Sequence, residues 1–595
     1  MTGIETRKPA GAGGSVANAW MRALASTAPI PQHRNRVFPV VIEELADRRN
    51  DAPALLSDRE CLTYRALNAR ANQIARWAIE NDLAKGGTVC LFMPNRPEYM
   101  AIWLGVTRVG GVVALINTNL TGPSLAHCIK IVKPKHVIVA AELGDVLTTA
   151  LPHLTGAASI WIHGDGIDAF ERHSGEALRQ NERRSVSIDD RALYIYTSGT
   201  TGLPKAANVS HARIMQWSHW FAGMMDVRVE DRMFDCLPMY HSVGGVLAPG
   251  AMLAGGGSLV ICDKFSARKF WSDVIRWDCT MLQYIGELCR YLLHTPPSPN
   301  DTRHRIRVAC GNGLSRDVWE PFQSRFRIPQ IFEFYAATEG GVSLFNVEGE
   351  CGALGRVPPY LRHRFSPTLL QFDVELGEPR RNEQGFCVPC APGETGEAIG
   401  PVGDDPADAG SRFEGYTNAE ASERKVLHGV FNPGDAWVRT GDLMRKDARG
   451  FFYFVDRIGD TFRWKGENVA ASEVSETICA FPGVKEASVY GVSISGADGK
   501  AGMAALVTEY ELDLKKLREH LITRLPHYAR PLFLRILKEM EVTGTFKHTN
   551  TNLMREGYDP SATADALYFN HLQNDAFVPL DEELYGRIQT GQVRL

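Results

Sequence analysis

At residues 194 to 205 the chain reads Tyr194-Ile195-Tyr196-Thr197-Ser198-Gly199-Thr200-Thr201-Gly202-Leu203-Pro204-Lys205, an apolar run that opens into hydroxyls and glycines and ends on a lysine. Ala192 to Tyr196 has the β-branched and aromatic content of a strand. Glycines at 199 and 202 let the backbone turn its N–H groups toward an anion, and four hydroxyls and an ammonium add further donors. The stretch therefore predicts a phosphate-holding loop.

This loop differs from the P-loop of kinases and GTPases, which requires the pattern G-x-x-x-x-G-K-[ST]. Here Lys205 follows Leu203-Pro204, and no Ser or Thr comes directly after it. A different phosphate chemistry is therefore expected. The alternative interpretation is an ordinary Ser/Gly-rich turn between a strand and a helix.

The 595-residue chain exceeds what one hydrophobic core usually supports, so two or three domains are expected. Hydrophobic residues make up 44% and charged residues 23%, with a formal net charge of -4. This balance shows no acidic or basic excess that would indicate nucleic acid or an anionic membrane as a partner. No run of about eighteen apolar residues indicates a bilayer span. The expected functional class is therefore a protein that acts on small molecules.

The twelve cysteines are scattered from Cys61 to Cys479 without the spacing of a disulfide framework, which favours a reducing cytosol. Cys387 and Cys390 form a close pair. No second CxxC completes a zinc site, and Gly385 lies beside the pair, so it predicts a β-hairpin with two chance thiols.

Strand and helix patterns alternate from Phe38 to about Leu143, for example an amphipathic helical stretch over 64–78 after which an apolar run covers 88–92. Such repetition predicts a mostly parallel sheet covered on both faces. Ser210 is expected to cap a helix that runs through Phe221. Residues 265–293 are expected to be mainly helical.

Further along, buried strands are expected at 306–309 and 330–334, and glycines and short alternating runs from Val374 to Val402 suggest a smaller β region. A boundary is predicted at Val455-Asp456-Arg457-Ile458-Gly459-Asp460, where an aromatic strand ends in charged and glycine residues. A compact α+β unit follows, with an irregular tail from Asp559.

The fold class is therefore α/β, with a large N-terminal domain of layered parallel sheets with helices and a small β region, plus a smaller α+β C-terminal domain. Residues 1–36, rich in Ala, Gly and Pro, are expected to form a loosely ordered arm, although 16–26 has helical composition.

Three polar clusters follow the loop: Gly311-Asn312-Gly313, Tyr335-Ala336-Ala337-Thr338-Glu339-Gly340 and Arg439-Thr440-Gly441-Asp442-Leu443. The first two leave the C-terminal ends of expected parallel strands, the edge where open α/β sheets bind ligands. A nucleotide needs an aromatic face for its base, a close backbone for the base edge, and carboxylates for the ribose hydroxyls and for Mg²⁺. The clusters hold all of these.

Together and in this order, the clusters resemble the adenylate-forming superfamily of acyl-CoA synthetases, non-ribosomal peptide adenylation domains and luciferases, from about Pro39 to the end. The likeness is narrowed by Asp460-Thr461-Phe462-Arg463-Trp464-Lys465-Gly466-Glu467-Asn468-Val469, Tyr284-Ile285-Gly286-Glu287-Leu288-Cys289-Arg290-Tyr291-Leu292 and Thr543-Gly544-Thr545-Phe546-Lys547. These stretches resemble the fatty acid transport protein branch, the long-chain and very-long-chain acyl-CoA synthetases. The resemblance implies that a fatty carboxylate attacks the α-phosphate of ATP, giving acyl-adenylate and pyrophosphate. Coenzyme A then takes the acyl group and AMP leaves.

The resemblance also implies a role for each matching residue. The pyrophosphate end is embraced by Thr197, Ser198, Gly199, Thr200, Thr201, Gly202 and Lys205, and the base is bordered by Gly311, Asn312 and Gly313, by Tyr335 packing on adenine, and by Ala336. Thr338 touches the α-phosphate, Glu339 holds Mg²⁺ with Thr200, Asp442 and Arg457 take the ribose hydroxyls, and His241 lies beside the acyl carboxylate.

The implied domains are an arm over 1–36, an adenylation domain binding ATP and the acyl group over 37–456, and a mobile C-terminal domain over 457–595. In the superfamily the C-terminal domain swings about a hinge, here Gly459. One orientation brings the catalytic Lys547 to the α-phosphate, and the other brings in the face from Arg463 to Gly466 for thioester formation. One well-placed cation contributes about 10³ or more in rate.

Each of these residues also has a purely structural interpretation. His241 reads as a satisfied core histidine, Asp442 as a turn aspartate, Glu339 as a helix-start acid and Lys547 as a solvated lysine. Ala336 stands where many relatives carry glycine, and residues 346–402 match the branch less closely than the rest.

The first hypothesis is thus an ATP-dependent long-chain or very-long-chain fatty acyl-CoA synthetase using ATP, Mg²⁺ and coenzyme A. The alternatives are a fatty acid uptake or transport protein, and an acyl-adenylating ligase for a bulky acid such as a bile acid or for an acyl carrier protein. Acid-dependent AMP formation with and without coenzyme A discriminates them. A cytoplasmic location is expected, while peripheral membrane association, a homodimer and the acyl chain length stay open.

Overall fold

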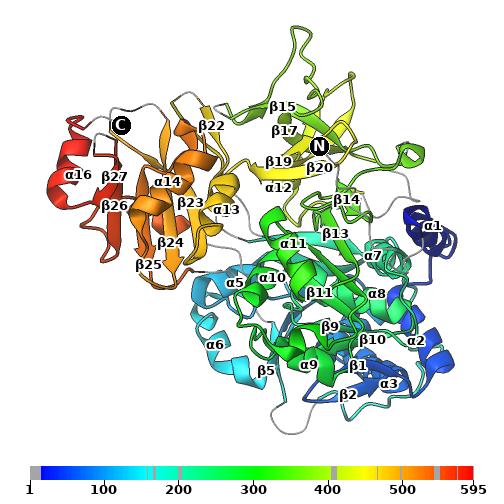
Figure 1. The fold of residues 1–595 in the computed structure, drawn as a ribbon. Coiled ribbons are helices and arrows are strands. Elements are labelled where there is room, and N and C mark those ends of the chain that lie inside the picture. Colours follow the sequence, from blue (N-terminus) through cyan, green and yellow to red (C-terminus); the bar gives the residue numbers. More distant parts are fainter. Residues whose placement is uncertain are drawn as a thin grey trace.

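The computed structural model describes residues 15–593 except 157, 165–168, 198–203, 363, 375, 404–411, 466, 496, 498, 542–549 and 573. Two sheets of mostly parallel strands, layered with helices, build the large N-terminal part, and a smaller unit of strands and helices follows (Figure 1). The α/β fold class expected from the sequence is confirmed. The division at residues 456 and 457 stays a prediction.

The first sheet has eight strands in the order β14-β13-β12-β11-β9-β10-β1-β2. They are β1 (Pro53–Leu56), β2 (Cys61–Thr63), β9 (Arg232–Asp235), β10 (Ser258–Ile261), β11 (Met281–Ile285), β12 (Val308–Asn312), β13 (Ile331–Ala336) and β14 (Ser343–Asn346). The strands from β13 to β1 run parallel, while β14 and β2 pair antiparallel at the edges. The parallel strands therefore share one carboxyl edge.

The second sheet has the order β6-β5-β3-β4-β7-β8. Its strands are β3 (Thr88–Phe92), β4 (Val112–Leu115), β5 (His136–Ala140), β6 (Ser159–His163), β7 (Arg191–Thr197) and β8 (Lys205–Ser210). Strand β8 pairs antiparallel with β7, and Thr197 lies opposite Lys205. The sequence did not predict β8, because Lys205 to Asn208 lacks β-branched and aromatic residues.

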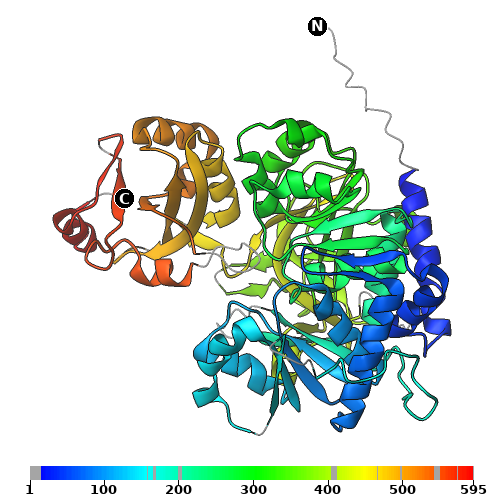
Figure 2. The same ribbon diagram turned by 90° about the horizontal axis from the view of Figure 1, so that it is seen from below.

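Helices connect the strands and cover both sheets (Figure 1, Figure 2). They are α1 (Val16–Thr27), α2 (Phe38–Arg49), α3 (Tyr64–Glu80), α4 (Pro97–Arg108), α5 (Gly122–Ile131), α6 (Gly144–Thr148), α7 (His211–Met224), α8 (Ala248–Ala254), α9 (Phe270–Arg276), α10 (Gly286–Leu293) and α11 (Arg316–Arg325). A π-helical turn, η4 (Val243–Leu247), leads into α8. As expected, Ser210 caps α7: its Oγ accepts a hydrogen bond from Arg213 N at 3.2 Å.

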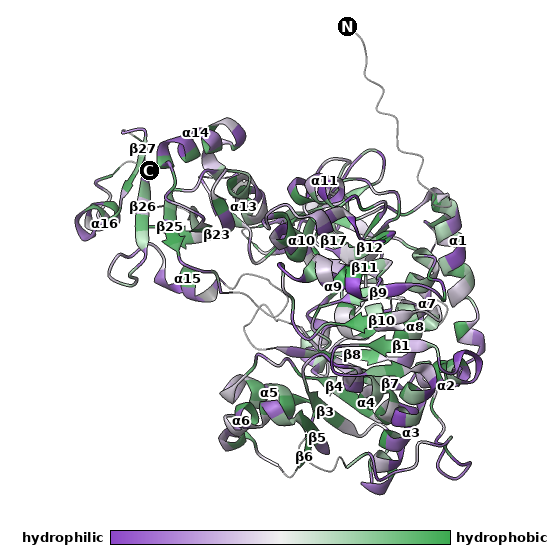
Figure 3. Ribbon diagram, turned by 60° about the horizontal axis from the view of Figure 1, so that its bottom comes forward, coloured by the Kyte–Doolittle hydropathy of each residue, from purple (hydrophilic) through white to green (hydrophobic). Residues whose placement is uncertain are grey.

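Side-chain alternation along β11 separates the two faces of the first sheet. Met281 packs into the core beside α7 and α8, whereas Leu282 and Tyr284 pack beside α9, α10 and α11. Figure 3 shows the interior strands β3, β4 and β10 in hydrophobic green, with hydrophilic purple on helices such as α14. The strands are therefore buried on both faces, as parallel strands are.

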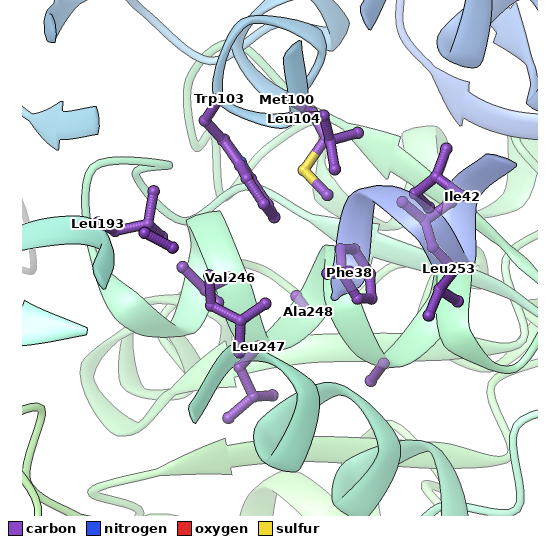
Figure 4. Close-up of a cluster of buried hydrophobic side chains, with 14 of the residues drawn as sticks. Phe38, Ile42, Met100, Trp103, Leu104, Leu193, Val246, Leu247, Ala248 and Leu253 are labelled. Atoms are coloured by element: carbon purple, nitrogen blue, oxygen red, sulfur yellow. The ribbon is translucent and has the colours of Figure 1, made fainter. Parts of the chain in front are cut away.

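The largest core lies where α2, α4, η4 and α8 meet (Figure 4). Phe38 stacks on Trp103 with ring centroids 6.0 Å apart, and Val246 and Leu253 approach the same cluster. Burying each such side chain contributes about 1.5–3 kcal/mol. This core fixes η4, the turn that follows His241.

Helix α1 packs against α7 at the periphery of this core. Trp20 is 2% exposed and meets Trp220 edge-on at 5.8 Å, with Phe345 and Phe365 close by. From Val16 onward, the segment expected to be a loosely ordered arm is thus a packed helix, while residues 1–14 lie outside the described part.

The expected small β region is an antiparallel sheet in the order β16-β15-β17-β19-β18, with β20 also paired to β19. Its elements are β15 (Thr368–Asp373), β16 (Glu378–Pro379), β17 (Thr395–Pro401), α12 (Ala419–Glu423), β18 (Val426–His428), β19 (Ala436–Lys446) and β20 (Phe452–Arg457). Strand β19 is long and carries two register shifts, one against β17 and one against β20. These bulges re-aim the residues around Gly441.

The C-terminal unit has its own hydrophobic core, formed by residues between 462 and 588. Its elements are β21 (Phe462–Trp464), β22 (Glu467–Val469), α13 (Ala471–Cys479), β23 (Val484–Ser493), β24 (Lys500–Thr508), α14 (Leu514–Arg524), β25 (Phe533–Leu537), α15 (Thr551–Glu556), β26 (Ala566–His571), β27 (Ala576–Pro579) and α16 (Glu582–Gln589). A five-stranded sheet, β23 to β27, supports the helices, which fits the expected α+β unit.

Two local predictions differ from the structure. Within residues 265–293, expected to be mainly helical, α9 and α10 are helices, but the prediction missed the strand β11 between them, because a short apolar run cannot be assigned to strand or helix by periodicity alone. The tail from Asp559 is not irregular, since it contains β26, β27 and α16. Within the described residues, no helix is both long and apolar enough to cross a bilayer.

Candidate active site

The candidate site begins at the carboxyl edge of the first sheet. Gly311 and Asn312 are the last two residues of β12, and Tyr335 and Ala336 are the last two of β13. The two strands are parallel neighbours, so the clusters predicted to surround a base do lie at one edge. Tyr335 is half-buried and Ala336 is exposed, which leaves the face of this strand end accessible.

Tyr335 is bonded to the first of two carboxylates. Its hydroxyl donates to Asp442 Oδ2 at 2.5 Å, and Arg457 Nε lies 3.6 Å from Asp442 Oδ1. Asp442 and Arg457 are opposite each other on β19 and β20. Three residues assigned to adenine and ribose are therefore in one cluster.

Glu339, after the end of β13, is the second carboxylate, and its side chain is 10% exposed. The hydroxyl of Tyr416 donates to Glu339 Oε1 at 2.5 Å, and Lys425 Nζ lies 3.6 Å from the same oxygen. Within the described chain, both of these contacts use Oε1. The other oxygen, Oε2, is the one this arrangement leaves for a cation.

Lys425 joins the two carboxylates into one site. Its Nζ also donates to Thr440 O at 3.1 Å, and Thr440 Oγ1 accepts a hydrogen bond from Asp442 N at 3.1 Å. Lys425 and Thr440 therefore connect Glu339 to Asp442 through polar contacts. The span between the two carboxylates is where the phosphate chain of a nucleotide would lie if its ribose were at Asp442.

A buried arginine holds the turn that carries Thr338 and Glu339. Arg213, from α7, is fully buried and donates from Nη1 to Thr338 O at 2.6 Å and from Nη2 to Arg412 O. Its Nε lies 3.5 Å from Glu414, whose backbone N–H in turn bonds Glu339 O at 3.0 Å. The turn is thus fixed from below by a charged network rather than by packing alone.

Gly340 makes this arrangement possible. Its φ is +93°, and a Cβ there would lie 2.2 Å from Arg412 O and 2.6 Å from Arg213 Nη2. A side chain would therefore displace the guanidinium that supports Glu339.

The paired strands β7 and β8 bring the two ends of the predicted phosphate loop, Thr197 and Lys205, to the same place. Lys205 Nζ lies over the ring of Tyr416, 5.6 Å from its centroid. Burial raises the pKa of Tyr416, and its hydrogen bond with the side chain of Thr197 opposes that effect. Thr197 and Lys205 thus meet the partner of Glu339. Ser198, Gly199, Thr200, Thr201 and Gly202 lie outside the described residues.

Gly311 has a structural demand that the sequence did not reveal. Tyr284, Gly311 and Glu333 are in register on β11, β12 and β13, and a Cβ on Gly311 would lie 2.5 Å from Tyr284 Cδ2. The tyrosine ring crosses Gly311, and its hydroxyl donates to Glu333 Oε2 at 2.5 Å. Glu333 Oε1 accepts from Leu314 N at 3.0 Å, so the pair also anchors the loop at Gly313.

Glu333 is 1% exposed, and desolvation by burial raises its pKa to about 8, while its hydrogen bonds with Tyr284 and Leu314 oppose the rise. It is therefore a buried acid beneath the loop at Gly313, which is predicted to border the base. Asn312, between the two glycines, is half-buried.

His241 lies near the same turn through its neighbour. Ser242 Oγ is 3.4 Å from Thr338 Oγ1, and the ring of His241 packs on Tyr240 at 4.6 Å between centroids. A Cβ on Gly245 would lie 1.7 Å from Met239 O, so only glycine allows η4 to fold back on this segment. The residue next to His241 therefore lies close to Thr338, and the assignment of His241 to the acyl carboxylate stays a prediction.

Of the residues assigned to the C-terminal unit, the structure describes Arg463, on β21. Gly466 and Lys547 lie outside the described residues. At the predicted hinge, Asp456 Oδ2 accepts a hydrogen bond from Ala471 N at 2.5 Å, and Ser472 Oγ donates to Val455 O. The last residues of β20 are thus bonded to the first turn of α13.

The donor set fits magnesium held partly by substrate. Within the described residues, no group of three or more His, Cys, Asp or Glu side chains could hold a metal ion by itself. Mg²⁺ commonly takes one or two carboxylates and completes its shell with substrate phosphates and water. Glu339, with one oxygen left over, meets that requirement, while Thr200 lies outside the described residues.

Comparison with known families agrees with this geometry. A model described as "AMP-binding enzyme" matches residues 42–368, and one described as "AMP-binding enzyme C-terminal domain" matches residues 473–547. This chain belongs to the AMP-binding enzyme family. The first model covers the two mostly parallel sheets and the second covers part of the unit that follows β20, while the antiparallel sheet with Asp442 lies between the two matched ranges.

Within the family, the relatives place the chain in one branch. Long-chain fatty acid transport protein 1 of Mus musculus is 38% identical over 571 residues, covering 94% of this chain and 88% of the relative. Long-chain fatty acid transport protein 3 of Homo sapiens is 40% identical, covering 86% of this chain and 76% of the relative. The predicted resemblance to the fatty acid transport protein branch is confirmed.

Solved structures of the family share the fold. ATP-bound MatB from Rhodopseudomonas palustris superposes with a TM-score of 0.72 at 23% identity, covering 88% of this chain and all of that chain. A fatty acyl CoA synthetase of Mycobacterium tuberculosis has a TM-score of 0.62 at 23% identity, covering 88% and 98%. The anthranilate CoA ligase AuaEII with anthranoyl-AMP gives 0.73 at 19%, covering 86% and 95%.

Sequence reasoning missed four residues of the site: Arg213, Glu414, Tyr416 and Lys425. Each bonds a residue far away in the chain; Tyr416 follows Glu339 by 77 positions and Arg213 precedes Thr338 by 125. The available signal was weak, an aromatic and glycine cluster over 413–416 in a loop. The spacing of residues along one sequence does not predict that this loop contacts Glu339.

Proposed function

We propose that this chain is an ATP-dependent, AMP-forming ligase that joins a long-chain or very-long-chain fatty acid to coenzyme A. The observation that carries the proposal is the pair of carboxylates, Asp442 and Glu339, joined through Thr440 and Lys425 at the carboxyl edge of the first sheet. The names of the relatives supply the acid, since they are long-chain fatty acid transport proteins.

In the first half-reaction a carboxylate oxygen of the fatty acid attacks the α-phosphorus of ATP. The bond from that phosphorus to the bridging oxygen breaks, and pyrophosphate leaves. Tyr335 packs on adenine, and Asp442, oriented by Tyr335 and Arg457, accepts hydrogen bonds from the ribose hydroxyls. Thr338 bonds the α-phosphate, and Lys205 with the loop before it takes the pyrophosphate end.

Magnesium, when bound, neutralises charge on the phosphate oxygens. Glu339 would hold it through Oε2, with Thr200 as the second proposed ligand. His241 lies beside the attacking carboxylate and orients it. Lys547 reaches the carboxylate oxygen and the α-phosphate. Because adenylyl transfer depends on positioning and charge neutralisation, losing Lys547 lowers the rate by about 10³-fold.

In the second half-reaction the thiol sulfur of coenzyme A attacks the acyl carbon, the carbon–oxygen bond to phosphate breaks, and AMP leaves. We propose that the C-terminal unit rotates about Gly459 between the two steps, bringing in Arg463 and Gly466. A Cβ on Gly459 would meet nothing within 4 Å, so there is room for a Cβ at this position. Gly459→Pro should keep acid-dependent pyrophosphate release but slow thioester formation, and normal overall turnover would contradict the hinge.

The test of the function is acid-dependent AMP formation across fatty acids of different chain length, with and without coenzyme A. A ligase forms AMP with long acids and needs coenzyme A for turnover. If no acid supports AMP formation, the result would favour the alternative that the chain is a fatty acid uptake or transport protein. AMP formed without need for coenzyme A would indicate transfer to a carrier protein, and a preference for a bile acid would indicate the bulky-acid alternative.

A further inference from the structure

Lys425 is a cation at the site for which the sequence motifs provide no role. It precedes β18, and its backbone O accepts a hydrogen bond from Arg439 N at 2.8 Å, so the side chain departs from the edge of the antiparallel sheet. From there Nζ reaches Thr440 O at 3.1 Å and Glu339 Oε1 at 3.6 Å. The ammonium therefore lies between the ribose cluster and the metal-binding carboxylate.

The order of groups in a nucleotide predicts which group would lie beside the Lys425 ammonium. If Asp442 holds the ribose and Glu339 holds the metal that binds phosphate, the α-phosphate must bridge the space between them. An ammonium has three N–H donors, and the hydrogen bond to Thr440 O uses one, while the ion pair with Glu339 at 3.6 Å is longer than a hydrogen bond. Donors are therefore left for an oxygen that enters this space.

A purely structural role explains these contacts less well. The side chain of Lys425 is 27% exposed, and an ion pair this open adds little to stability. The neighbouring cation gives the contrast. Arg439 is 16% exposed and is committed to two carboxylates, Glu397 at 2.9 Å and Glu378 at 3.0 Å. Among the described residues Lys425 forms one ion pair, with the proposed metal ligand Glu339, and its charge also opposes the rise that burial causes in the pKa of Glu397.

We propose that Lys425 is a further catalytic residue whose ammonium contacts the α-phosphate oxygens of the nucleotide and neutralises charge that develops there during adenylation. Without substrate the ammonium donates to Thr440 O and pairs with Glu339; with substrate its remaining donors bond the phosphate. This inference rests on the proposed function. It adds a cation from the N-terminal domain to the one expected from Lys547.

The first test measures binding, not activity. Isothermal titration calorimetry compares AMP with adenosine on the full chain and on Lys425→Met, Lys425→Arg and Lys446→Met. Lys446 is an exposed lysine at the far end of β19, packed over Phe452, and serves as the matched control. Lys425→Met should weaken AMP about 10- to 100-fold while adenosine stays within about twofold. Lys425→Arg should recover part of the loss.

Three results would overturn the proposal. If AMP and adenosine weaken equally, Lys425 supports the ribose loop. If AMP affinity is unchanged, the ammonium does not reach the phosphate. If AMP with Mg²⁺ binds more tightly to Lys425→Met, Lys425 only competes for Glu339. Thermal unfolding of each variant shows whether it is folded, and Lys425→Arg keeps the comparison available if the methionine variant is not.

The second test separates the two half-reactions. With saturating ATP and a long acid, Lys425→Met should form acyl-adenylate about 10²-fold or more slowly in single turnover. Thioester formation from supplied acyl-adenylate should change much less. An unchanged adenylation rate would contradict the proposal. If the wild-type chain forms no AMP with any acid, the proposed function fails instead, and the comparison of AMP with adenosine still decides the role of Lys425.

Discussion

The two carboxylates of the site have nearly the same surroundings. Asp442 accepts a tyrosine hydroxyl at 2.5 Å and has a cation at 3.6 Å, and Glu339 does the same with Tyr416 and Lys425. The difference is in the oxygens. At Asp442 the two partners use different oxygens, Oδ2 and Oδ1, whereas at Glu339 both use Oε1.

This difference in which carboxylate oxygens are occupied suits Asp442 to bind hydroxyl groups and Glu339 to bind a metal ion. A carboxylate held at both oxygens has a fixed orientation and accepts hydrogen bonds at its remaining lone pairs, as ribose hydroxyls require. A carboxylate held at one oxygen presents the other to a metal ion. The same tyrosine–carboxylate–cation arrangement therefore gives a hydroxyl acceptor at one end of the nucleotide and a metal ligand at the other.

Neutralising each carboxylate should produce the largest contrast. Glu339→Gln keeps the shape and the Tyr416 contact but removes the charge that holds the metal, so kcat for AMP formation should fall about 10²- to 10³-fold. Asp442→Asn should instead raise KM for ATP about 10- to 100-fold, because it weakens a charge-assisted hydrogen bond made in the ground state as well. Steady-state kinetics with varied ATP and Mg²⁺ measures both.

The assignment is reversed if Asp442→Asn lowers kcat and Glu339→Gln raises KM only. Equal effects on kcat and KM in both variants would mean that the two carboxylates are equivalent, and the difference in their oxygens would carry no function.

Removing the tyrosine hydroxyls should sharpen the contrast with a smaller effect. Tyr416→Phe frees Oε1 of Glu339, so the carboxylate loses its fixed direction, and the Mg²⁺ concentration for half-maximal rate should rise about 10-fold. Tyr335→Phe should raise KM for ATP by a similar factor without changing the Mg²⁺ dependence. A shift in Mg²⁺ dependence with Tyr335→Phe would contradict the division of roles.

The sequence was informative where function lies in a short motif. Asp442 and Arg457 were assigned to one sugar, and the register of β19 and β20 puts them opposite each other. Tyr335 and Glu339 could be predicted as one cluster because the end of β13 and the turn after it are contiguous in the chain, and their roles stay predictions. Glycines and hydroxyls before Lys205 predicted a loop whose residues 198–203 lie outside the described part, and they did not predict the strand β8 that begins at Lys205.

The rest depended on the path of the chain in space. Tyr416, Lys425 and Arg213 act on the Glu339 turn from other elements, and nothing in their local sequence marks them. Gly311 shows the same limit in another form. It was predicted to border a base, but the close ring of Tyr284 is visible only once three strands are in register.

Tyr284 and Glu333 extend the comparison to a third tyrosine–carboxylate pair, also at 2.5 Å, and here the shift of the carboxyl pKa has no cation among its causes. Burial raises the pKa of Glu333 to about 8, above its ordinary value of 4.5. Below pH 4.5 the group is protonated in both the folded and the unfolded chain. Between 4.5 and 8 only the unfolded chain releases the proton, so this contribution to stability is lost as pH rises through 8.

The effect on stability is the smallest of those predicted. Glu333→Gln stays neutral and keeps an acceptor for Leu314 N, so it should flatten the decline in unfolding temperature between pH 5 and pH 8.5. The wild-type decline from this one group is at most about 1.4 kcal/mol per pH unit. Thermal unfolding of Glu333→Gln and Tyr284→Phe across that range measures it. A variant Glu333→Gln with the same pH slope as wild type would mean that Glu333 is ionised in the fold, so that the tyrosine alone suffices to hold a buried charge. The cations at Asp442 and Glu339 would then be needed only for ligands.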